Sequence, residues 1–347
     1  MIVYLGLFGA LFLGGLSFSD RRLRLYFTLV FVFLLWFMGG RRYVGCDFSG
    51  YLNRYLQTPP DLSLNALLYE LDEPGFWLLT SVTKALGLSY MWLNVFASFI
   101  ILSCFWVFCR AHRDRAMILA LLFPVMIIQL SMSGIRQAIA VGFLMVATVA
   151  WMHGSRPWTA IWILIGALFH TSVVMFLPIA YIAGRRVSTI RLVIAAIILG
   201  PIAVFLLSDR VDTYVERYIG SEVTSGGALI RYMLIMIPAG LFVIYRRRVA
   251  SAFSQYYNLL KLFTIIAFSL IPIALYSSIL LHRVNYYIMP FSIVLFVYLS
   301  RVAFTRFSLN VARMIPGVIY GAYSVMWFLT SRHANLCYVP YDNYLFH

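Results

Sequence analysis

The composition of this chain excludes a water-soluble globular protein. Of its 347 residues, 63% are hydrophobic, 17% are aromatic and only 11% are charged, although the formal net charge is +15. So few charged residues cannot cover the surface of a soluble domain, so we predict a polytopic membrane protein. The basic residues form no continuous stripe on a soluble module, which argues against nucleic-acid binding.

Apolar runs predict an all-α protein with about 12 transmembrane or half-membrane helices in one integral membrane domain over residues 1–347. The first run lacks the basic start of a signal peptide, so we predict that it is the first membrane helix. The segment 74–88 is apolar but short, which favours a re-entrant or amphipathic helix. The predicted spans are residues 2–18, 25–39, 90–109, 116–131, 135–152, 158–169, 172–183, 192–207, 229–245, 262–281, 284–299 and 314–330.

The basic residues predict which ends of these spans face the cytoplasm. If segment 74–88 does not cross the membrane and the chain turns near His170, every cluster of basic residues falls on one face, which is cytoplasmic by the positive-inside rule. Both termini, the loops 40–89 and 208–228 and the tail 331–347 then lie outside. The cytoplasmic residues are Arg21, Arg22, Arg24, Arg110, Arg113, Arg115, Arg156, Arg185, Arg186, Arg191, Arg246, Arg247, Arg248, Lys261, Arg301, Arg306 and Arg313.

The basic residues on the outer face need an explanation other than topology. Nearly all are arginine, whose planar fork binds phosphate with two hydrogen bonds, although a general preference for arginine explains the same count. These residues are Arg41, Arg42, Arg54, Lys84, Arg136, Arg210, Arg217, Arg231, Arg283 and Arg332.

Arg136 is the strongest of these candidates because it lies within the apolar stretch 117–152. An arginine inside a membrane segment costs roughly 2.5 to 3.5 kcal/mol to insert, so it normally faces a protein interior or an aqueous cavity. It follows a Ser133–Gly134 break and opens a helix, whose N-terminus would help to bind a phosphate. A structural ion pair with Asp47 or Glu73 is the alternative.

Other polar residues on the outer face are candidates for catalysis or binding. His170 lies at a turn and is either a general base or a helix-to-helix hydrogen-bonding residue. Segment 40–51 is predicted to be a ligand-binding loop with Arg41, Arg42 and Asp47, although both arginines could simply snorkel to the interface. Glu73 precedes a proline and marks either a helix start or a catalytic acid.

The remaining candidates lie later in the chain. Arg231 is three residues inside the span 229–245, and His282 and Arg283 close an outer turn. Tyr341 belongs to a tail that we expect to dock on the outer surface. The four cysteines, Cys46, Cys104, Cys109 and Cys337, show no metal-binding spacing, so we predict packing residues and neither a metal site nor a cofactor.

Five short motifs resemble the EpsG family of polysaccharide polymerases, which is part of a broader Wzy-like group. They occur in order along essentially the whole chain, and each alone is weak. Cys46 departs from the family, which commonly has a small polar residue there. The motifs are Arg42-Tyr43-Val44-Gly45-Cys46-Asp47-Phe48 followed by Tyr51, Glu73-Pro74-Gly75-Phe76, Gly134-Ile135-Arg136-Gln137, Phe169-His170-Thr171-Ser172 and Tyr338-Val339-Pro340-Tyr341.

The resemblance implies a GT-C-like glycosyltransferase in the bacterial inner membrane, with its active site facing the periplasm and no metal requirement. Such an enzyme transfers a growing glycan from undecaprenyl pyrophosphate onto the next lipid-linked repeat unit of an O-antigen, capsule or exopolysaccharide. Its expected partners are lipid-linked oligosaccharides, membrane lipids, a chain-length regulator and a flippase.

The chemistry implied by the resemblance suggests a role for each candidate. Arg136, Arg42 and either Arg231 or Arg283 would bind the pyrophosphate with help from Gln137, because fixed guanidinium groups stabilise the charge of a leaving group. His170 would deprotonate the acceptor hydroxyl, with Asp47 and Glu73 as competing candidates. The full set of predicted site residues is His170, Asp47, Glu73, Arg41, Arg42, Tyr51, Arg136, Gln137, Arg231, His282, Arg283 and Tyr341.

Three other functions remain open from the sequence. An O-antigen ligase would use the same donor with a different acceptor. A flippase or transporter for lipid-linked sugars would show internal repeats and charges near the membrane midplane. A membrane acyltransferase would also use an intramembrane histidine, but its substrate would come from the cytoplasm.

Overall fold

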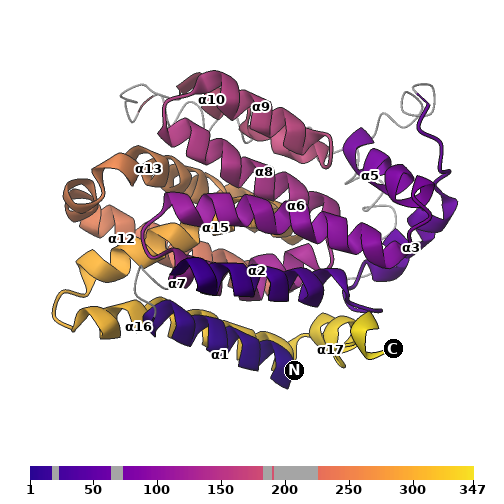
Figure 1. Ribbon diagram of the computed structural model, residues 1–347. Helices are drawn as coiled ribbons and strands as arrows, with labels where there is room; N and C mark the ends of the chain where they lie inside the picture. Colours follow the sequence, from indigo (N-terminus) through magenta and orange to yellow (C-terminus); the bar gives the residue numbers. More distant parts are fainter. Residues whose placement is uncertain (18–22, 64–72, 183–189, 191–225) are drawn as a thin grey trace. The chain divides into compact units, whose positions relative to one another are not determined.

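The computed structural model describes residues 1–17, 23–63, 73–182, 190 and 226–347 and is all-helical over this part of the chain (Figure 1). The predicted span 192–207 and nearly all of the loop 208–228 lie outside the described residues. The described helices are α1 Ile2–Ser17, α2 Leu23–Gly39, α3 Phe48–Gln57, α5 Pro74–Ala85, α6 Tyr90–Ala111, α7 Arg115–Leu122, the π-helix η1 Phe123–Ser131, α8 Ile135–Met152, α9 Arg156–Ala167, the 3₁₀ helix η2 Thr171–Phe176, α10 Pro178–Ile182, α12 Gly226–Ala252, α13 Ser254–Ser269, α14 Ile271–Tyr276, α15 Ser278–Ala303, α16 Leu309–Thr330, α17 Arg332–Tyr338 and the 3₁₀ helix η3 Tyr344–Phe346.

Five described helices are long and apolar enough to cross a membrane, which is the pattern of a multi-pass membrane protein. They are Tyr90–Ala111, Ile135–Met152, Gly227–Ala252, Ser254–Leu275 and Leu280–Ala303, and the last one is the most buried inside the protein. Shorter apolar helices include Ile2–Ser17 and Leu25–Gly39. The expected number of about twelve spans and the GT-C-like architecture stay predictions.

The chain folds into two compact units, each with its own core. Unit 1 comprises Met1–Val146, Ile165–Thr171 and Pro316–His347, and unit 2 comprises Ala147–Leu164 and Ser172–Ile315. The expectation of one integral membrane domain over residues 1–347 stays a prediction.

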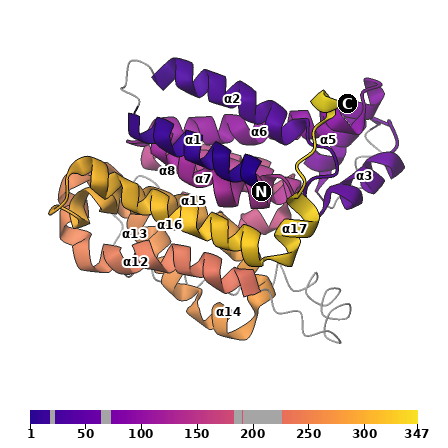
Figure 2. The same cartoon turned by 90° about the horizontal axis from the view of Figure 1, so that it is seen from below.

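The helices of unit 1 pack in antiparallel pairs, α1 with α7 and α2 with α6, and the pairs lie side by side in both views (Figures 1 and 2). The end of α2 meets the start of α6, where a Cβ added at Gly39 would lie 2.7 Å from the Cα of Val95. At the opposite end, the guanidinium of Arg115 lies 5.8 Å from the ring centroid of Phe27. Arg41 therefore lies at one end of the unit 1 helices, and Arg110 and Arg115 lie at the other end, as the charge pattern predicts.

Two predicted features of the outer loops have different outcomes. The amphipathic helix expected at 74–88 forms as α5, which buries Phe76 and Trp77 and exposes Leu78. The loop predicted over 40–51 is only partly a loop, because α3 begins at Phe48. Its buried residues Phe48, Tyr51 and Tyr55 recur at helical spacing among polar residues, so a short amphipathic helix forms on the surface of unit 1.

Two predicted membrane spans differ from the structure in helix type or in limits. The limits of the span 116–131 are confirmed to within one residue, but the helix begins as α7 and continues as the π-helix η1. The predicted span 262–281 is wrong in its limits, because α13 begins at Ser254 and the helix breaks at Leu270 ahead of Pro272. The turn expected near His170 is confirmed, since α9 ends at Ala167 and η2 begins at Thr171.

Candidate functional site

The centre of the candidate site is a buried carboxylate between an arginine and a histidine in unit 1. Nδ1 of His170 lies 2.5 Å from Oε1 of Glu73, and Nη1 of Arg136 donates a hydrogen bond to Oε2 of the same carboxylate. The Glu73 side chain is fully buried, whereas 10% of the His170 side chain and 25% of the Arg136 side chain are exposed. Glu73 thus orients a partly exposed arginine and a largely buried histidine. We call Glu73, Arg136, His170 and Tyr51 the Glu73 cluster.

The backbone around Glu73 is held in place by the neighbouring turn. Glu73 has a φ of 68°, in the left-handed region that residues other than glycine rarely occupy, and Pro74 starts α5 directly after it. The Gly75 amide donates to the carbonyl oxygen of Leu168 at 2.8 Å, two residues before His170. A backbone hydrogen bond therefore connects the start of α5 to the turn that carries His170.

A methyl group at Gly75 is expected to disturb this join. The added Cβ would lie 3.0 Å from both Cβ and the carbonyl oxygen of Leu168, so the start of α5 would have to shift away from the turn. We expect Gly75→Ala to lower the activity of the protein by about tenfold, because small misplacements of catalytic groups are costly. Gly50→Ala is the matched control, since nothing lies within 4 Å of its Cβ. Equal activities of the two variants would contradict this prediction.

Tyr51 of α3 completes the cluster from the other side of Arg136. Its hydroxyl accepts a hydrogen bond from the Arg136 amide at 3.5 Å, and the Arg136 guanidinium lies 5.7 Å from its ring centroid. The Tyr51 ring in turn packs on Phe76 of α5, with ring centroids 5.4 Å apart. Arg136 is therefore held between a carboxylate and an aromatic face, both of which favour its charge.

The hydrogen bond to Glu73 fixes how His170 can exchange protons. A carboxylate accepts the proton on Nδ1, which leaves Nε2 as the nitrogen that takes up a proton from another group. The same carboxylate stabilises the imidazolium that would form. Arg136 also forms an ion pair with Glu73, which is one of its two predicted partners.

Arg41 occupies a structural position and does not join the Glu73 cluster. It is 1% exposed, and its guanidinium donates to the carbonyl oxygens of Val44, at 3.2 Å, and Met38, and to Oδ1 of Asn94 at 3.0 Å. The snorkelling alternative is wrong for this residue because its charge is buried. Its guanidinium holds the loop after α2 through these hydrogen bonds, so we remove Arg41 from the predicted binding residues.

Arg41→Lys is expected to lower the free energy of unfolding. A lysine ammonium lacks the planar fork and cannot reach three acceptors that are spaced for a guanidinium. Leaving buried acceptors unsatisfied costs about 1–3 kcal/mol. Thermal unfolding of the purified protein in detergent measures the effect, with the exposed Arg110→Lys as control. A melting temperature equal to that of the control would contradict the structural role.

The other predicted residues of unit 1 lie around the cluster or in the tail. Arg42 is partly exposed, with Nη1 at 3.6 Å from Oδ2 of Asp342. Asp47 is exposed at the start of α3, and Gln137 is half-buried beside Arg136 in α8. The expected docking of the tail is confirmed, because Tyr341 donates to the carbonyl oxygen of Phe37 at 2.9 Å and stacks on its ring.

Unit 2 holds a second group of predicted residues. Nη2 of Arg231 donates to Nδ1 of His282, and the guanidinium lies 5.6 Å from the ring centroid of Tyr286. Arg231 is 5% exposed, and Arg283 is half-buried on α15. The side-chain amide of Asn285 donates to the carbonyl oxygen of Ala228 at 3.0 Å, which joins α15 to the start of α12.

The prediction that all four cysteines are packing residues is wrong for two of them. Cys46 and Cys337 form a disulfide, with a sequence separation of 291, whereas Cys104 and Cys109 are buried free thiols as expected. Both paired cysteines fall in segments predicted to share the outer face, a signal that could have suggested the pair. His333, Cys46 and Cys337 also bring possible metal-ligand atoms within 4.8 Å of one another, but the disulfide uses both sulfurs.

These features define an all-helical, multi-pass membrane protein with a buried carboxylate that orients a histidine and an arginine. The chain belongs to the EpsG family, whose model matches residues 24–343. This is a Wzy-like, polymerase-type family of polysaccharide biosynthesis, so the protein is a glycosyltransferase-like polymerase of that type. No curated protein and no solved structure matches the chain.

Proposed function

We propose that this protein polymerises oligosaccharide repeat units carried by undecaprenyl pyrophosphate at the outer face of the bacterial inner membrane. The growing glycan leaves its lipid carrier and is transferred to a hydroxyl at the non-reducing end of the next lipid-linked unit. The observation that carries the proposal is the Glu73 cluster, which places a base and an anion-binding group on one carboxylate.

His170 is the general base of the proposed reaction. Its Nε2 takes the proton from the acceptor hydroxyl while Glu73 holds Nδ1 and stabilises the imidazolium. Glu73 itself is fully buried and covered by its two partners, so it is a positioning residue for His170. Asp47 is the remaining candidate from the sequence, but its exposed position at the start of α3 favours His170 for this role.

Arg136 binds the departing pyrophosphate. Cleavage of the sugar–phosphate bond builds negative charge on the leaving group, and a guanidinium held by Glu73 and Tyr51 meets that charge with little reorganisation. Arg136 also lies in the first turn of α8, where the helix N-terminus favours an anion. Arg42 and Gln137 in unit 1 are further proposed glycan or pyrophosphate contacts. The binding role expected for Arg231, His282 and Arg283 of unit 2 stays a prediction.

Two observations support the outer face as the location of the site. Arg110 and Arg115 lie at the end of the unit 1 helices away from Arg41, and such basic residues favour the cytoplasmic side. The Cys46–Cys337 disulfide belongs to the same end as Arg41, and disulfides persist in oxidising compartments such as the periplasm. The proposed partners are then a flippase that delivers the substrate and a chain-length regulator.

Gene deletion with complementation tests the proposed function. We expect a deletion strain to accumulate glycans of one repeat unit, and the wild-type gene to restore a ladder of long chains on gels. Loss of all surface glycan would favour a ligase or flippase instead. An unchanged ladder would contradict any role in polymerisation.

A further inference from the structure

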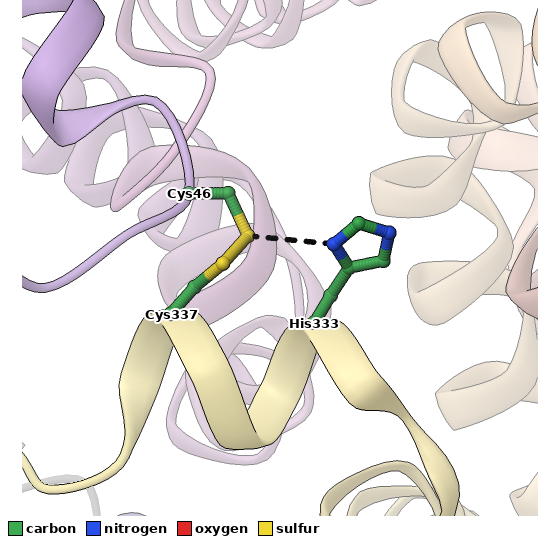
Figure 3. A group of neighbouring side chains, drawn as sticks. All are labelled: Cys46, His333 and Cys337. Carbon is green, nitrogen blue, oxygen red and sulfur yellow. Dashed lines mark hydrogen bonds between the residues drawn. A yellow bond between two sulfur atoms is a disulfide. The ribbon is translucent and has the colours of Figure 1, made fainter.

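A covalent strap holds the C-terminal segment against the loop after α2 in unit 1. Figure 3 shows Cys46 of that loop joined to Cys337 of α17, with His333 on the same side of the helix. The amide of Gly45 adds a hydrogen bond to the carbonyl oxygen of Cys337 at 2.7 Å. We call Gly45, Cys46, Cys337 and Tyr338 the strap.

A chain of hydrogen bonds runs from the strap to the turn before Arg136. The Cys46 amide donates to Oγ of Ser133 at 2.9 Å, and the hydroxyls of Ser133 and Tyr338 are 2.6 Å apart. The Tyr338 hydroxyl donates to the carbonyl oxygen of Gln129 at 3.2 Å. Tyr338 has one hydroxyl proton and donates it to Gln129, so Ser133 must donate its own proton to Tyr338. Each hydroxyl therefore donates one hydrogen bond and accepts another.

The backbone of the strap also packs closely against the turn that precedes α8. Gly45 has a φ of 106°, and a Cβ at this position would lie 1.9 Å from the carbonyl oxygen of Met132. Only glycine permits both this φ and this approach. Ser133 accepts at its carbonyl from the amide of Ile135 at 3.0 Å, so the turn leads directly into α8. Arg136 therefore follows, within three residues, a turn that the strap contacts through both its backbone and a hydroxyl.

We propose that the Cys46–Cys337 disulfide and Ser133 are positioning groups for Arg136. This inference rests on the proposed function, in which Arg136 binds the departing pyrophosphate. With the disulfide closed, the strap fixes the start of α8 and thereby the guanidinium relative to Glu73. With the disulfide open, only hydrogen bonds hold the strap, and Arg136 loses its fixed geometry.

The disulfide can be opened chemically in the intact protein. Cys46 is exposed, and Nδ1 of the exposed His333 lies 3.9 Å from its sulfur. A small dithiol such as dithiothreitol attacks one sulfur, breaks the S–S bond and is oxidised to its own cyclic disulfide. Cys46 and Cys337 take up the two electrons and two protons as free thiols, so the step balances.

The experiment measures initial rates of polymerisation with purified protein in liposomes. The substrate is a lipid-linked repeat unit extracted from the deletion strain. We expect Ser133→Ala and Cys46→Ser/Cys337→Ser to lower kcat by about tenfold or more while KM changes less than about threefold. Ser133→Thr, which keeps the hydroxyl, should recover most of kcat. Cys104→Ala/Cys109→Ala is the control for cysteine replacement and should retain wild-type kcat.

Dithiothreitol provides a test on the unaltered sequence. The rate of the wild-type protein should fall with the fraction of free Cys46 and Cys337 and recover on reoxidation, whereas Cys46→Ser/Cys337→Ser should not respond. Wild-type kcat in Ser133→Ala and in the reduced protein, with His170→Ala inactive, would overturn the positioning role but leave the proposed function intact. Full activity of His170→Ala would instead overturn the proposed function.

Discussion

Replacement of His170 by alanine is expected to lower the rate of polymerisation by about 10²–10⁴-fold, the usual contribution of a general base. The imidazole is held by Glu73 at 2.5 Å and has no equivalent in the Glu73 cluster, because Glu73 itself is fully buried. Cells that carry His170→Ala should therefore make glycans of one or a few repeat units. Gel electrophoresis of the extracted glycan measures the change directly.

A matched histidine controls for this replacement. His153 is exposed, and the chain reaches it directly after the last residue of α8, at the other end of that helix from Arg136. We expect His153→Ala to give chains of wild-type length at equal protein level. Long chains from His170→Ala would show that another group takes the proton.

The second large effect concerns the charge balance of the Glu73 cluster. Arg136→Met leaves the fully buried Glu73 without its permanently charged partner, and removal of one member of a buried ion pair costs about 3–5 kcal/mol. Glu73→Gln should cost less, because a quarter of the Arg136 side chain is exposed. Both single variants should make little polymer. Arg136→Met removes the group that binds the leaving pyrophosphate, and Glu73→Gln removes the carboxylate that holds His170.

The double variant Arg136→Met/Glu73→Gln separates stability from activity. Without either charge, no unpaired ion is buried, so its melting temperature in detergent should exceed that of Arg136→Met. Polymer synthesis should remain lost. Recovery of polymer synthesis in the double variant would mean that the Arg136–Glu73 pair is purely structural. Replacement of the exposed Arg110 by alanine serves as the control for loss of an arginine.

Much of the helical framework could be predicted from the sequence because long apolar runs are limited by charged and turn residues. The helix α8 matches its predicted span 135–152, and α1 and α2 differ from theirs by only a few residues. In contrast, hydropathy could predict neither α3 nor the π-helical form of η1 within the span 116–131. The first is short and half polar, and the second differs from an α-helix in hydrogen bonding and not in composition.

The candidate site could be predicted as a set of residues but not as an arrangement. Motifs around Glu73, Arg136 and His170 identify polar groups in apolar surroundings, and Glu73 was one of two predicted partners for Arg136. The sequence could not show that Glu73 also binds His170, because the two lie 97 positions apart. Likewise, the disulfide joins residues whose proximity depends on how α2 and α17 meet.

Release of undecaprenyl pyrophosphate by the purified protein in liposomes tests the central claim most directly. With lipid-linked repeat units as substrate, the wild-type protein should release one carrier pyrophosphate for each glycosidic bond formed. His170→Ala should bind the same units with similar affinity but release almost no carrier. Release at the wild-type rate from His170→Ala, together with chain growth, would contradict the assignment of His170 as the base.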